Sequence, residues 1–141
     1  MHRLRRRYAH LLLSLLAIAL LSACSGAKKN SELELILYSY ESTIRWGDFA
    51  GAWEMVDPEY REKHPLTATD WERFKQVRVA GYRSGGPTVI EEGKIGQVVE
   101  VEVINVHTQT PRTIMDRQVW QWDPEAKRWW LKTGLPDITR R

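Results

Sequence analysis

The sequence has a single cysteine, Cys24, among its 141 residues. One thiol cannot form an internal disulfide, so the stability of the fold has to come from packing in any redox compartment. Histidine is also scarce, because only His64 and His107 follow residue 23. Two isolated histidines and one cysteine do not make a metal site, and we expect neither a metal nor another cofactor.

Motifs of the common enzyme classes are absent as well. No serine, cysteine or lysine lies in a nucleophile motif. The glycine-rich segment 81–86 lacks the lysine and the following helix of a phosphate-binding loop. No catalytic residue can therefore be named from a local motif.

The N-terminus combines a cationic start with a short apolar run. Residues 2–7 hold four arginines, an apolar run follows from Leu11 to Leu21, and two small residues precede Cys24. This order is typical of a secretory signal. A transmembrane helix needs about 20 apolar residues, roughly twice the length of this run. We therefore expect export rather than a membrane span.

The tetrapeptide Leu21-Ser22-Ala23-Cys24 resembles the box of bacterial lipoprotein signals. The resemblance implies a signal over residues 1–23, cleavage before Cys24 and lipidation of that cysteine; a structural free cysteine is the alternative. Residues 24–30 would then be the lipidated cysteine and a short polar tether. In a cell with two membranes, Ser25 resembles the residues that permit delivery to the outer membrane. The implied location is the cell envelope, on the periplasmic face of the outer membrane.

The leader also accounts for the basic charge of the chain. The whole sequence is net +3, but four of its 21 Lys and Arg residues lie in the leader, which holds no acid. The remaining 17 face 18 Asp and Glu, which is close to −1. No basic stripe remains to neutralise phosphates, so we expect no nucleic-acid partner.

Residues 31–138 predict a single α+β domain that begins with helices. A first helix is expected from Ser31, as its N-cap, to Trp46. Its apolar stripe consists of Leu33, Ile36, Leu37, Tyr40 and Ile44. Gly47 ends this helix, and Asp48 caps a second one that Asp57-Pro58 terminates.

The next segment is expected to be less regular. Residues 59–66 are charged and irregular, and Pro65 breaks them. A capping box from Thr69 to Glu72 then predicts a third short helix. In that helix Trp71 and Phe74 point inward.

Beyond residue 76 the apolar period changes from 3.6 to 2, which predicts strands. The expected strands are 77–82, 88–91, 97–107, 112–123 and 128–135. In the third of these the apolar residues change face after Val103. That change predicts a bulge or sharp bend near Val103, which would curve the sheet.

The order of these features resembles the nuclear transport factor 2-like superfamily. The resemblance rests on the helical stripe, the Gly47-Asp48-Phe49 break, the helix end at Asp57-Pro58-Glu59-Tyr60, and the closing hairpin Trp122-Asp123-Pro124 to Arg128-Trp129. It implies a strongly bent antiparallel sheet that wraps the first helix into a cone with an internal pocket. It also implies that the chain could form a homodimer through the sheet.

Three polar side chains are candidates for the lining of such a pocket: Tyr82, His107 and Asp116. Isomerases of the superfamily use an aspartate base and an oxyanion hole made by a tyrosine and a protonated acid. No local motif ties the three residues to those roles. His107 could act as an acid or base near neutral pH, or it could simply cap the rim of the sheet.

The closing hairpin carries four tryptophans, Trp120, Trp122, Trp129 and Trp130. Residues two apart on a strand share a face, and adjacent residues point to opposite faces. Both faces of the hairpin therefore carry an indole, and we expect at least one of the four to be exposed. Such an indole would offer a binding face to a protein or a small apolar ligand, whereas simple packing is the alternative for each tryptophan.

Together these features predict a lipid-anchored periplasmic protein that acts as a small binding or assembly module. The membrane is one partner, reached through the lipid, and a protein or small apolar ligand is the other. The alternative is a pocket enzyme of the isomerase or dehydratase type on the same fold.

Overall fold

The computed structural model describes residue 26 and residues 28–138, so Cys24 and the predicted signal lie outside the described residues. Within this part of the chain, a long helix over residues 28–45 is followed by three short helices. These are α2 (Phe49–Trp53), α3 (Pro58–Lys63) and α4 (Ala68–Phe74). No helix among the described residues is long and apolar enough to cross a membrane.

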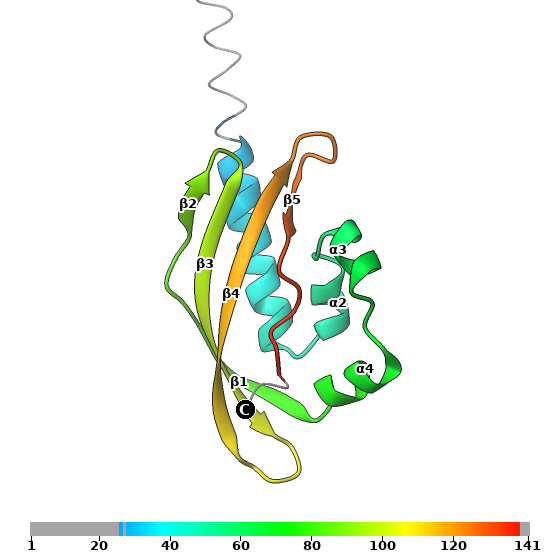
Figure 1. The fold of residues 1–141 in the computed structure, drawn as a ribbon. Helices are drawn as coiled ribbons and strands as arrows, with labels where there is room; N and C mark the ends of the chain where they lie inside the picture. The colour runs from blue at the N-terminus through cyan, green and yellow to red at the C-terminus, as the bar shows by residue number, and fades with distance from the viewer. Residues whose placement is uncertain (1–25, 27, 139–141) are drawn as a thin grey trace, which may run out of the picture.

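A five-stranded antiparallel sheet follows the helices. Its strands are β1 (Val77–Ser84), β2 (Thr88–Glu91), β3 (Lys94–Asn105), β4 (Pro111–Asp123) and β5 (Arg128–Leu131). The order is β1-β3-β4-β5, and β2 pairs with the first residues of β3, next to the end of β1. The sheet is strongly curled and wraps around the long helix (Figure 1). The predicted α+β class and the bent antiparallel sheet are therefore confirmed.

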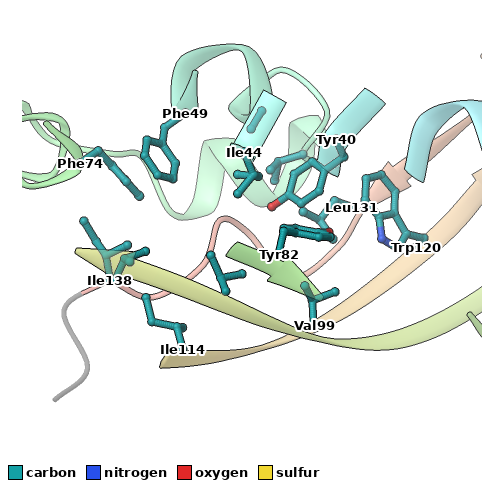
Figure 2. Close-up of a cluster of buried hydrophobic side chains, with 14 of the residues drawn as sticks. Tyr40, Ile44, Phe49, Phe74, Tyr82, Val99, Ile114, Trp120, Leu131 and Ile138 are labelled. Atoms are coloured by element: carbon teal, nitrogen blue, oxygen red, sulfur yellow. The ribbon is translucent and has the colours of Figure 1, made fainter. Parts of the chain in front are cut away.

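The core fills the concave side of the sheet. The long helix contributes Tyr40 and Ile44, both fully buried. The ring of Tyr40 meets Trp120 of β4 edge to face, with centroids 5.2 Å apart. Figure 2 shows these side chains beside Leu131 and Val99. The stripe predicted for the first helix thus faces the core, where burying large apolar and aromatic side chains stabilises the fold.

The irregularity expected near Val103 lies in the neighbouring strand. The register between β1 and β3 shifts between Val79 and Gly81, opposite Val103. Simple alternation would have placed Tyr82 on the face of Arg78, but the extra residue turns Tyr82 into the buried interior. A bulge in either of two paired strands bends the pair, so the sequence pattern of one strand does not say which of them carries it.

The long helix begins earlier than predicted. Residues 28–30 are already helical, and the hydroxyl of Ser31 donates to the carbonyl of Lys28 instead of capping the helix. The indole of Trp129 donates to the Lys29 carbonyl at 3.1 Å. This contact joins residues 100 positions apart, so no local signal could have placed the polar segment 28–31 in the helix.

The region after α2 contains a helix that the sequence prediction missed. The chain leaves α2 at Trp53, forms a bridge between Val56 and Leu131, and then enters α3. Asp57 caps α3 through a hydrogen bond from the Tyr60 amide, and Pro58 occupies the first turn. From the sequence, Asp57-Pro58 is predicted only to end the second helix. It also starts a helix, because proline at the first helical position costs no hydrogen bond.

The capping box of α4 lies two residues before its predicted position. Thr67 accepts from the Asp70 amide at 3.2 Å, and Asp70 accepts from the Thr67 amide at 2.9 Å. The predicted capping residues, Thr69 and Glu72, both lie within α4, so neither of them caps it. Among the strands, β3 starts three residues early, and β5 ends at Leu131 instead of Leu135.

Candidate functional site

The structure brings Tyr82 and Asp116 together but leaves His107 apart from them. His107 is exposed in the turn after β3, where its amide donates to the Asn105 side chain at 2.9 Å. It therefore lies at the rim of the sheet and not in a pocket with the other two candidates. Asp116 and Tyr82 point from β4 and β1 into the interior of the curled sheet.

Gln118 connects the two interior candidates. Its side-chain amide group donates to the Asp116 carboxylate at 2.7 Å and to the Tyr82 hydroxyl at 3.2 Å. Its oxygen accepts from Gln97 at 2.6 Å and from the indole of Trp120 at 3.2 Å. No motif in the sequence marks Gln97 or Gln118 as part of a site. Their only signal is the period of two, which aligns Gln118 with Asp116 and Trp120 on the inward face of β4.

Burial controls the charge states of this network. It raises the pKa of Asp116 to about 6, although the hydrogen bond from Gln118 opposes the rise. Burial also raises the pKa of Tyr82 to about 12, and the charge of Asp116 adds to this effect while the bond from Gln118 opposes it. Tyr40 is completely buried, and its pKa lies well above the ordinary value because of burial and of Asp116. Near neutral pH the site thus combines a carboxylate with two protonated tyrosines.

One hydroxyl in the interior has no partner. The Tyr40 hydroxyl makes no hydrogen bond to any described residue. Tyr40 and Tyr82 lie close together in the core (Figure 2). A hollow of about 350 Å³ opens beside the loop that connects β1 to β2, and its lining includes Gly85, Gln97 and Gln118. The hollow reaches the glutamine side of the network, but Tyr40 and Asp116 do not line it.

A second hollow, here called the α3–α4 groove, lies between these helices and residues 134–138. It measures about 370 Å³. Its apolar and aromatic lining consists of Trp53, Tyr60, His64, Pro65, Leu66, Phe74, Leu135, Pro136 and Ile138. Tyr60 and His64 stack with their centroids 4.4 Å apart, and the Asp70–Arg73 ion pair of 3.3 Å lies at the edge of the groove. His64 is exposed and also lines this groove.

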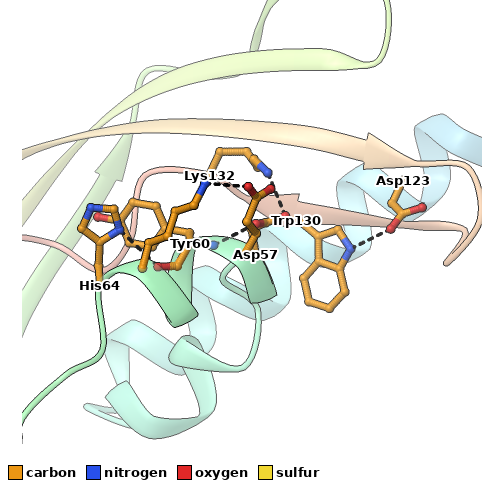
Figure 3. A network of polar contacts seen from close by, with 8 residues as sticks. Asp57, Tyr60, His64, Asp123, Trp130 and Lys132 are labelled. Atoms are coloured by element: carbon orange, nitrogen blue, oxygen red, sulfur yellow. Dashed lines mark hydrogen bonds and ion pairs between the residues drawn. The ribbon is translucent and has the colours of Figure 1, made fainter.

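An ion pair fixes the two walls of the α3–α4 groove to each other. Lys132, just after β5, contacts the Asp57 carboxylate at 2.8 Å (Figure 3). Burial acts to raise the pKa of Asp57, but the bonds from Lys132 and from the Tyr60 amide outweigh it and hold the pKa below its usual range. Beside this pair, Gly134 has φ +77°, and a β-carbon there would lie 2.7 Å from the Tyr60 hydroxyl. Only glycine allows the two walls to approach this closely.

The four hairpin tryptophans do not form an exposed face. Trp120 and Trp129 are buried, and Trp122 and Trp130 are half-buried. Trp122 packs against Trp129 at 5.8 Å. Arg128 covers the ring of Trp130 at 3.8 Å, and the Trp130 indole donates to Asp123. The expectation of an exposed indole among the four is therefore wrong, because covering by neighbouring side chains is not encoded in strand periodicity.

Comparisons with models of known protein families, with curated proteins and with solved structures found no match for this chain.

Proposed function

We propose that this protein is anchored to the cell envelope by a lipid on Cys24, on the periplasmic face of the outer membrane. Its domain would be a cone of the nuclear transport factor 2-like type that binds a small ligand in the α3–α4 groove. The leader and the Leu-Ser-Ala-Cys box support the anchor. The curled sheet around the long helix is compatible with the cone.

The α3–α4 groove is the observation that carries the binding role. Its volume of about 370 Å³ lies within the range of small-molecule sites and is too small for a folded partner. Aromatic rings cover much of its wall, while His64 and the Asp70–Arg73 pair supply a few polar groups. This lining fits a small molecule with one flat apolar ring system and a hydrogen-bonding substituent. The ion pair between Asp57 and Lys132 holds the walls in place before the ligand arrives, which lowers the cost of binding.

The interior of the cone is a weaker candidate for a ligand because side chains fill it. Tyr40, Ile44 and Trp120 are completely buried and occupy the space between the helix and the sheet. A ligand there would have to displace packed core. The α3–α4 groove needs no such rearrangement.

Fluorinated aromatic fragments provide a direct test of the groove. The core draws on residues 33–138, so a soluble chain that begins at Ser25 keeps all of it. We expect the ¹⁹F signals of some fluorinated indoles, quinolines or benzoates to broaden in the presence of this chain. The substitution Leu66→Trp fills the groove and should abolish the broadening.

The control carries the same indole elsewhere. Ile90→Trp places it on the exposed strand β2, outside the groove lining. Fragment binding should survive in this variant. If no fragment distinguishes Leu66→Trp from Ile90→Trp, the groove is not the binding site.

One observation favours the enzyme of the isomerase or dehydratase type as a second candidate. Asp116 is a buried carboxyl with a pKa of about 6, linked through Gln118 to the hydroxyl of Tyr82. Such a group suits proton abstraction next to a carbonyl. Deuterium exchange at the α-carbon of cyclic ketones, catalysed by the wild type and lost in Asp116→Asn, would favour this candidate over the binding module.

A further inference from the structure

The long helix has two apolar faces, and the core covers only one. Leu35, Tyr38 and Trp46 are 63%, 75% and 86% exposed. The amide of Trp46 donates to the carbonyl of Ser42 at 3.1 Å, so this residue continues the helical geometry. Positions separated by three and eleven residues fall on one side of a helix. The three side chains form one stripe, here called the outer stripe, opposite the buried stripe that includes Tyr40 and Ile44.

An outer stripe of this kind needs an explanation. The solvent face of a helix in a globular protein is normally polar. Here three large apolar side chains lie on it within about three turns, or roughly 16 Å. The charged pair Glu41–Arg45 beside them is joined at 3.5 Å and neutralises itself. Grouped exposed apolar residues mark a surface that contacts something else.

The chain upstream of the helix indicates what that surface contacts. The apolar run Leu11–Leu21 and Cys24 lie just before it. From Cys24 to Lys28 an extended chain reaches at most about 14 Å. The start of the helix therefore stays near the bilayer, whether a lipid on Cys24 or the apolar run itself provides the attachment. The bond from Trp129 to the Lys29 carbonyl fixes this end of the helix to the sheet, so the domain and helix are positioned together.

We propose that the outer stripe lies on the lipid surface and docks the domain in one orientation. The long helix then runs along the interface, and the convex side of the sheet faces away from the membrane. Tryptophan and tyrosine favour this depth because one end of each ring system is apolar and the other is polar. The proposal rests on membrane attachment of the N-terminal segment, which is part of the proposed function.

The charges of the helix predict which lipids are needed. Lys28, Lys29 and Arg45 are balanced by Glu32, Glu34 and Glu41. The helix therefore has no net attraction to anionic headgroups. Docking through buried apolar area should occur equally on neutral and anionic bilayers.

Site-directed spin labelling of the full processed chain in vesicles tests the docking. Lipidation leaves no free thiol, so the label enters only at an introduced cysteine. Tyr38→Cys and Trp46→Cys report on the outer stripe. Met115→Cys is the control, because Met115 is 51% exposed on the outward side of β4. The measurement is the ratio of collisions with oxygen to collisions with a nickel chelate, in phosphatidylcholine vesicles with and without phosphatidylglycerol.

We expect this ratio to be several-fold higher at positions 38 and 46 than at position 115, in both kinds of vesicle. Equal ratios at the three positions would overturn the proposal. Shielding of positions 38 and 46 from both reagents would also overturn it, because a second protein copy would then cover the stripe. A high ratio only with phosphatidylglycerol would contradict docking through apolar area.

The same experiment separates a failure of the anchor from a failure of the docking. If the spin label enters the wild-type chain, Cys24 has a free thiol. That result contradicts lipidation but does not contradict docking of the outer stripe. The comparison of positions 38, 46 and 115 is then made in the Cys24→Ser background, where the uncut apolar run holds the chain at the bilayer. Equal ratios in that background would overturn the docking.

Discussion

Asp116 illustrates how one buried carboxyl couples the interior of the fold to pH. Transfer from water disfavours its charged form, and a single strong hydrogen bond from Gln118 compensates only in part. Its folded pKa of about 6 lies above the value near 3.8 of an unperturbed carboxyl. The folded state therefore holds a proton between about pH 4 and pH 6 that the unfolded state has already released. In that interval stability falls as the pH rises.

The substitution Asp116→Asn should remove this dependence. Asparagine keeps an oxygen that can accept from Gln118 but does not ionise. A rise in pKa from 3.8 to about 6 corresponds to roughly 3 kcal/mol. The variant should thus gain up to roughly that much stability relative to wild type as the pH increases from about 4 to above 6. Urea denaturation at a series of pH values measures the difference, and parallel stability curves would show that the carboxyl is not perturbed.

Helix α3 is held both by contacts with neighbouring residues and by contacts with residues far away in the sequence. Asp57 caps it locally through the Tyr60 amide, and the same carboxylate meets Lys132, which lies 75 positions further along the chain. The amide of Asp57 also donates to the Leu131 carbonyl at 2.8 Å. A helix of six residues has little stability of its own, so these tertiary contacts decide that it forms.

Replacing Asp57 by alanine should destabilise the fold by about 1–3 kcal/mol, since both the cap and a partly buried ion pair are lost. Two variants separate the contributions. Asp48→Ala removes the equivalent cap of α2 and should cost about 1 kcal/mol, because Asp48 has no ion-pair partner among the described residues. Lys132→Met removes the ion pair and keeps the cap. Chemical denaturation near neutral pH is the measurement, and an Asp57→Ala loss no larger than that of Asp48→Ala would show that Lys132 contributes nothing.

The Asp57 carboxylate should make stability depend on pH in the opposite direction from Asp116: its contribution is lost when the pH falls. The folded pKa of Asp57 is lowered, so its contribution is complete above the ordinary value and is lost as the pH falls through the folded pKa. The excess stability of wild type over Asp57→Ala should therefore shrink below about pH 4.

In the whole molecule, one end of the curled sheet lies beside the start of the long helix. Lys29 is close to Gly93 in the turn between β2 and β3, and its ammonium nitrogen lies 5.8 Å from the ring centroid of Trp129 in β5. The chain enters the fold at this end, so any anchor upstream determines which end of the domain is near the membrane. Association of two copies through the sheet stays a prediction; exposed apolar residues of the described strands include Ile90, Val98 and Met115.

The anchor itself is tested by Cys24→Ser in the full chain. The Leu-Ser-Ala-Cys box predicts that this variant stays uncut and takes up no lipid. Metabolic labelling with a fatty acid, followed by a mass measurement of the purified chain, checks both statements. Equal label in wild type and variant would contradict lipidation at Cys24.

Much of the fold was predictable because its signals are local. The strand 88–91 has the predicted bounds, Asp48 caps α2, and the buried stripe of the long helix follows from its period. Of the candidate site, the sequence could single out Tyr82 and Asp116 as residue types. It could not join them, because Gln118 and Tyr82 are 36 positions apart. The α3–α4 groove was missed, since its walls come from two helices and a distant C-terminal segment.

The sequence by itself determined the absence of an internal disulfide, the α+β order and the periods of the helices and strands, and it predicts the leader; all of these depend on composition or on neighbours within a few residues. The tertiary structure alone decided where the sheet bulges, which tryptophans are covered, and that α3 forms on an Asp-Pro step. It also decided that the Asp116 carboxyl is buried away from solvent. Burial and pairing depend on residues that are distant in sequence, and a pattern of period 2 or 3.6 carries no information about which distant surface will cover a given face.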